Sequence, residues 1–81
     1  MFKNRAANGK KNMVGEAIKH YRLMLKDAPS QQRFAVLLQL SGLDVGKNAI
    51  QKIESGDRFV TDIELKVIAE VLEVTCDELL G

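Results

Sequence analysis

The segment from Lys47 to Lys52 carries side chains whose types and spacing suit hydrogen bonding to base edges. Lysine can donate to guanine O6 and N7, and asparagine and glutamine can bond adenine N6 and N7 in a bidentate way. With about 100° of rotation per residue, one side of a helix there presents the polar set Lys47, Asn48, Gln51 and Lys52. The opposite side is apolar. Such a face either binds the bases of a nucleic acid or is merely solvated. The helices and turns around it are needed to choose between the two interpretations.

The helix expected over 46–55 has clear limits. Its apolar positions Ile50 and Ile53 are three residues apart and therefore face one side. Gly56 follows, and glycine readily takes the left-handed conformation that ends a helix. We therefore expect a short amphipathic helix that stops at about Ser55.

Two capping boxes follow this helix. In Thr61-Asp-Ile-Glu64 and Thr75-Cys-Asp-Glu78, a threonine hydroxyl and a glutamate three residues later can satisfy each other's backbone N–H groups. The first box precedes the helically spaced set Leu65, Ile68, Ala69 and Leu72. Closely spaced helix signals of this kind predict a compact all-α domain.

The first half of the chain predicts two more helices and a leader. Helical spacing of apolar residues marks a helix over 13–26, and Ser30 is placed to cap a second one that runs through Phe34 to Leu40. Gly42 marks the turn after it. Residues 1–12 are polar and basic and are expected to be flexible, with Asn12 as a cap for the first helix. The expected division is a leader over 1–12 and a domain over 13–81.

Composition limits the class of protein. The 81 residues allow one small domain, and Cys76 is the only cysteine, so no intrachain disulfide can form. No apolar run approaches the ~20 residues that span a bilayer, which predicts a cytoplasmic protein with no membrane contact. No metal-ligand cluster, nucleophile motif or phosphate-binding glycine pattern is found, so no enzyme activity, metal or cofactor is expected.

Charge is distributed unevenly along the chain. Residues 1–60 carry 11 Lys and Arg against 5 Asp and Glu, a net +6, whereas residues 61–81 carry 1 Lys against 6 acids, a net −5. The first part should attract polyanions and the second should repel them. The sequence pI of 7.9 is lower than that of a typical basic nucleic-acid-binding domain.

Several segments together resemble the Cro/repressor-type (Xre-like) helix-turn-helix family. The resemblance covers 14–80, and its most specific parts are Ser30-Gln31 with Phe34-Ala35, Ile50-Gln-Lys-Ile-Glu54-Ser-Gly56, and Ile68-Ala69 with Leu72. It implies a compact five-helix domain of the lambda-repressor-like type. The chain has a few more residues between Ala35 and Glu54 than the common pattern, which indicates a longer-turn variant.

The resemblance also implies roles for individual residues. Gln31 would bond a backbone phosphate from the start of the second helix, and Arg58 would meet another from the loop after the third. Lys47, Asn48 and Gln51 would face bases, and Lys52 a base or a phosphate. Arg22 and Glu54 would form a structural ion pair between the first and third helices.

Two functions from different classes follow. The first is a repressor-like transcriptional regulator that binds double-stranded DNA as a homodimer, on half-sites about 34 Å apart. The second is a protein-interaction module, such as an antitoxin-like or regulator-binding partner, with weak or secondary DNA binding. Its partner would meet the acidic C-terminal third, which holds Glu70, Glu73, Asp77 and Glu78. The sequence gives no firm dimer surface, and exposed apolar residues near Leu79 and Leu80 are candidates for one.

Overall fold

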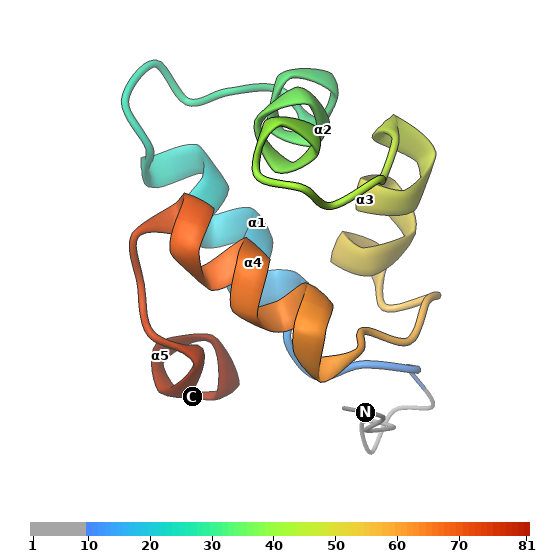
Figure 1. The fold of residues 1–81 in the computed structure, drawn as a ribbon. Coiled ribbons are helices and arrows are strands. Elements are labelled where there is room, and N and C mark those ends of the chain that lie inside the picture. The colour runs from blue at the N-terminus through green and yellow to red at the C-terminus, as the bar shows by residue number, and fades with distance from the viewer. Residues whose placement is uncertain (1–9) are drawn as a thin grey trace.

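A computed structural model describes residues 10–81, which fold into five α-helices (Figure 1). They are α1 (Gly15–Met24), α2 (Gln31–Leu40), α3 (Lys47–Ser55), α4 (Asp62–Leu72) and α5 (Cys76–Leu80). No strand occurs between residues 10 and 81, so the prediction of an all-α fold is confirmed for this part of the chain. No helix there has the length and apolar character needed to cross a membrane.

The core lies where α1, α2, α3 and α4 meet. Phe34 of α2, Ile18 of α1 and Ile68 of α4 are each at most 1% exposed. Ile50 and Ile53 bring the apolar side of α3 into the same cluster. In Figure 1, α4 lies in front of α1 and packs against it, while α3 and α5 lie on opposite sides of this pair.

The predicted helix limits are present in the structure. Thr61 and Thr75 each form a complete capping box, with Glu64 and Glu78 respectively. The hydroxyl of Ser30 accepts a hydrogen bond from the backbone N–H of Arg33 and caps α2. Gly56 takes a φ of 86° at the end of α3, the left-handed conformation expected there.

Helix α1 is shorter than the predicted 13–26. It begins after Val14, and the backbone turns extended at Leu25. Asp27 and Ala28 then adopt positive φ values before Pro29. The backbone oxygen of Pro29 accepts a hydrogen bond of 2.7 Å from Arg22 Nη1, which ties the chain back to α1. Helix α1 therefore ends at Met24, two residues earlier than its apolar spacing indicates.

Two further expectations were wrong. Leu79 is 1% exposed and belongs to the core, and Leu80 packs partly against it, so this pair does not offer an exposed apolar contact. The short α5 turns its apolar side onto α1 and α4. In addition, Asn12 was placed in a flexible leader but is 1% exposed. The folded part thus begins before residue 13, while the rest of the expected leader, residues 1–9, lies outside the described residues.

Candidate functional site

The outer face of α3 gathers four polar side chains that no other described group engages. Lys47, Asn48, Gln51 and Lys52 are exposed, while the opposite side of α3 is buried through Ile50 and Ile53. None of the four side chains bonds to another residue between Lys10 and Gly81. Their donors and acceptors are therefore available to a ligand.

Three other carboxamides, those of Asn12, Gln31 and Gln39, are used internally, whereas that of Gln32 is exposed. The amide nitrogen of Gln39 donates to the backbone oxygen of Val45 at 2.7 Å, and that of Gln31 donates to Glu54 at 3.0 Å. Asn12 makes several internal bonds. The amides of Asn48 and Gln51 differ from these because they have no structural task in the described residues.

A shallow hollow of about 390 Å³ runs along the C-terminal part of this face, lined by Asn48, Gln51, Lys52, Ser55 and Asp57. It combines amide groups, an ammonium group and one carboxylate. The Asp57 carboxylate lies 3.5 Å from the Ser55 hydroxyl. Such a lining can exchange several hydrogen bonds with a flat polar ligand, and its acid disfavours an anion at that end.

The connection from α2 to α3 sets the start of this face. Leu43 N–H bonds back to Leu38 O at 2.9 Å, and Val45 is only 5% exposed, so the turn is anchored in the core. The bond from Gln39 braces the same turn. Gly46 is the N-cap of α3 and supplies no side-chain cap.

A buried carboxylate connects α3 to α1 and α2. Glu54 Oε2 accepts from Arg22 Nε at 2.7 Å, and Glu54 Oε1 accepts from Arg22 Nη2 at 3.1 Å. The ion pair expected between these residues is therefore present, with side-chain exposures of 7% for Arg22 and 3% for Glu54. Gln31 also donates to Glu54 Oε1, which directs its amide into the fold. The Glu54 carboxylate of α3 therefore bonds side chains of both α1 and α2.

The C-terminal end of α3 meets the N-terminal end of α1 through Asn12. The Asn12 amide nitrogen donates to Ile53 O at 3.1 Å and to Arg58 O at 2.7 Å, while its oxygen accepts from the N–H groups of Val14 and Gly15. The positive end of one helix dipole thus faces the negative end of another, which is favourable.

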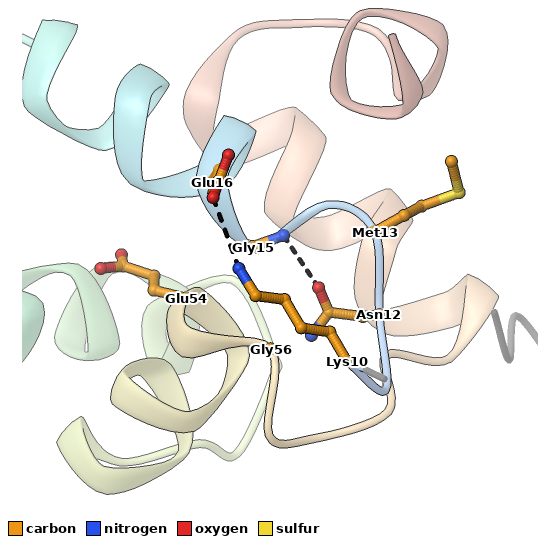
Figure 2. A pocket seen from close by; sticks show the side chains of 7 residues that line it. All are labelled: Lys10, Asn12, Met13, Gly15, Glu16, Glu54 and Gly56. Carbon is orange, nitrogen blue, oxygen red and sulfur yellow. Dashed lines mark hydrogen bonds and ion pairs between the residues drawn. The ribbon is translucent and has the colours of Figure 1, made fainter. Parts of the chain in front are cut away.

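The two helix ends approach so closely that Gly15 has no room for a side chain. A Cβ there would overlap Ile53 O and lie 2.8 Å from Glu54 O. A small pocket of about 150 Å³ lies beside this contact. Figure 2 shows Lys10 extending across it toward Glu16. The Lys10 ammonium nitrogen lies 3.4 Å from Glu16 Oε1. The backbone N–H of Lys11 donates to Gly56 O at 2.7 Å and completes the attachment.

Arg58, expected to meet a phosphate, lies in the loop after α3 and pairs with Glu64 of the first capping box. Nη2 lies 2.9 Å from Oε2, and Nη1 lies 3.4 Å from Oε1. Partial burial by itself raises the pKa of Glu64. The hydrogen bonds from the Thr61 backbone and from Arg58, together with the charge of Arg58, outweigh it and hold that pKa below its ordinary value.

No family model, curated protein or solved structure matches this chain. The function of the site must therefore follow from its own geometry and charge. Sequence reasoning found the outer face of α3 and named Asn12 as a cap of the first helix, in keeping with its bonds to the N–H groups of Val14 and Gly15. It missed the bonds of Asn12 to Ile53 and Arg58 and the pair of Arg58 with Glu64. The capping box in the sequence predicted that Glu64 lies at the start of a helix, but it did not indicate that Glu64 pairs with Arg58.

Proposed function

We propose that this chain is a sequence-specific, repressor-like transcriptional regulator that binds double-stranded DNA. In this proposal α2 and α3 form a helix-turn-helix of the lambda-repressor-like (Cro/repressor, Xre-like) type, and α3 lies in the major groove. The observation that carries the proposal is the outer face of α3, where Lys47, Asn48, Gln51 and Lys52 are exposed and unbonded within the described chain. The major groove admits a helix, and amide and ammonium groups match its base edges.

Charge and neighbouring groups support this orientation. Arg58 lies in the loop after α3, and Gln31 begins α2, where the backbone N–H groups of a helix start favour a phosphate. The exposed acids Glu70, Glu73, Asp77 and Glu78 belong to the C-terminal part of the chain. In Figure 1, α5 lies on the far side of the molecule from α3, so DNA at α3 would avoid Asp77 and Glu78, which α5 carries.

The proposed active form is a cytoplasmic homodimer. A single module of this size buries only ~600–1,000 Å² on DNA, and two modules on half-sites ~34 Å apart reach useful affinity. Large apolar side chains remain exposed, including Leu40 at 80% and Ile63 at 72%. They, rather than Leu79, are available for a contact between subunits.

The first test measures binding to duplexes selected from a random-sequence pool, by fluorescence anisotropy over a range of salt. Affinity should fall steeply with salt because phosphate contacts release counterions. The Lys47→Ala/Lys52→Ala double variant should lose at least ~10-fold in affinity, about 1.4 kcal/mol. The control is Lys19→Ala/Lys66→Ala, which removes the same charge from exposed positions on α1 and α4 and should change affinity far less.

A second test addresses base reading. Gln51→Ala should relax preference at one base pair, at a cost of ~1–3 kcal/mol. Gln32→Ala, an equivalent change on α2, should leave base preference unchanged. Equal retention of wild-type protein and the Lys47→Ala/Lys52→Ala variant on duplex DNA at low salt would refute the proposal.

The second candidate function is a protein-interaction module whose acidic surface on α4 and α5 meets a basic partner. Its support is the exposure of Glu70, Glu73 and Asp77. The two functions differ in the first test: an interaction module would bind duplex DNA only weakly and without preference for a selected sequence, and its binding to the protein partner would not need the α3 lysines.

A further inference from the structure

Arg58 is held at both its backbone and its side chain before any ligand is bound. Its carbonyl oxygen accepts from Asn12 Nδ2 at 2.7 Å, and its guanidinium pairs with Glu64 at 2.9 Å. The Arg58 side chain is 33% exposed, so part of the guanidinium still faces solvent. A loop arginine with these attachments has less conformational freedom to lose on binding.

The group that holds the guanidinium is itself fixed. Glu64 Oε1 accepts from the backbone N–H of Thr61 at 3.0 Å, while Glu64 N–H donates to the Thr61 hydroxyl at 3.1 Å. The Glu64 side chain is 15% exposed. Capping α4 therefore places a carboxylate rigidly beside the loop that follows α3.

The geometry of the pair leaves the arginine able to bind a second anion. Glu64 engages the two terminal nitrogens, Nη1 and Nη2. A guanidinium paired in this way keeps Nε–H and the second hydrogen of each terminal nitrogen for other acceptors. A phosphate oxygen can therefore bond the same arginine without displacing the carboxylate.

We infer that Glu64 is a positioning residue for DNA binding, which holds the Arg58 guanidinium ready for a backbone phosphate next to the α3 site. This inference rests on the proposed function. It makes one carboxylate serve two purposes, the start of α4 and the direction of Arg58. A carboxylate near DNA would otherwise weaken binding through repulsion, so removing its charge should strengthen binding. The positioning role predicts the reverse, that removing the charge of Glu64 weakens DNA binding.

The experiment compares Arg58→Ala, Glu64→Gln and the double variant by the slope of log K against log salt, on the selected duplex. Each phosphate contact contributes about 0.9 to this slope. Arg58→Ala should reduce the magnitude of the slope by about 0.9. Glu64→Gln should also reduce this magnitude and weaken binding. The double variant should have the same slope as Arg58→Ala. Glutamine keeps an oxygen that can cap Thr61 N–H, so the fold should survive the change.

Two control variants separate positioning from other effects. Thr61→Ala removes the hydroxyl half of the capping box but keeps the Arg58–Glu64 pair, so it should lower the urea midpoint without changing the slope. Glu70→Gln removes an exposed acid from the same helix, away from Arg58, and should not reduce the slope.

Each contrary outcome has a distinct meaning. Tighter binding by Glu64→Gln would show that the carboxylate competes with phosphate, and an unchanged slope in Glu64→Gln or in Arg58→Ala would remove the positioning role. In both cases the proposed function stands if wild-type binding still depends on the α3 lysines. Absence of any duplex binding by wild-type protein would instead overturn the proposed function itself.

Discussion

Replacing Glu54 by glutamine should destabilise the fold severely for so small a change. The substitution keeps the volume and removes the charge that Arg22 faces in the interior. Both side chains are less than a tenth exposed, at 3% for Glu54 and 7% for Arg22. Breaking a buried pair by neutralising one partner costs ~3–5 kcal/mol because the other charge is left uncompensated. Since Arg22 keeps its bond to Pro29 O, we expect the lower end, about 3 kcal/mol.

That loss is large relative to the stability of the whole domain. At ~0.05–0.15 kcal/mol per residue, a chain of 81 residues is stable by ~4–12 kcal/mol. Urea unfolding followed by circular dichroism at neutral pH measures the change. The midpoint of Glu54→Gln should fall sharply while the m-value stays constant, because the amount of surface exposed on unfolding is the same.

Two companion variants test the reasoning. Gln31→Ala removes the third hydrogen bond to Glu54 but leaves the ion pair intact, so it should cost less than Glu54→Gln. Arg22→Met/Glu54→Met replaces both charges with apolar groups and should be more stable than Glu54→Gln alone. A loss below ~1 kcal/mol in Glu54→Gln, or a double variant less stable than the single one, would contradict the account of a buried, mutually dependent pair.

Three further changes have expected signs. Gly15→Ala, which would stabilise an open helix by ~1 kcal/mol, should instead cost ~1–3 kcal/mol because its Cβ would overlap Ile53 O; the melting temperature should fall. Gly46→Ser should gain a few tenths of a kcal/mol in a urea titration, since this N-cap has an extended backbone and no atom within 4 Å of the added Cβ. Acidification should remove the advantage of wild type over Glu64→Gln. Because the pKa of Glu64 is lowered in the folded state, its carboxylate stabilises the fold at pH values above the ordinary pKa of 4.5, and this contribution is lost as the pH falls through the lowered pKa. The urea midpoints of wild type and Glu64→Gln should therefore converge in acid and differ by a constant amount at neutral pH.

Local signals in the sequence predicted most of the helix limits. The pairs Thr61 with Glu64 and Thr75 with Glu78 act over a single helical turn, and Gly56 acts through its own backbone, so short-range reading was sufficient. The helical spacing of apolar and polar residues in α3 likewise predicted which face is buried. The ion pair of Arg22 with Glu54 was expected only from the family resemblance.

Among the contacts that sequence reasoning missed, those of Asn12 join distant parts of the chain. Asn12 bonds Ile53 and Arg58, which follow it by 41 and 46 residues. An asparagine before a helix reads as a local cap, and nothing in its neighbours reveals that its amide nitrogen faces another helix. Leu79 was misjudged for a related reason, because a five-residue helix has too few positions to show which side it buries.

The position of Asn12 has a consequence for which sequences can adopt this fold. Its side chain must offer an oxygen to two N–H groups on one side and an NH₂ group to two carbonyls on the other. Aspartate has the same shape but would place a negative charge against both carbonyl oxygens, and leucine can form none of the bonds. Glutamine is one methylene too long for this site, where Asn12 is only 1% exposed. Any protein that shares this architecture should therefore retain a carboxamide of this length at the entrance to its first helix.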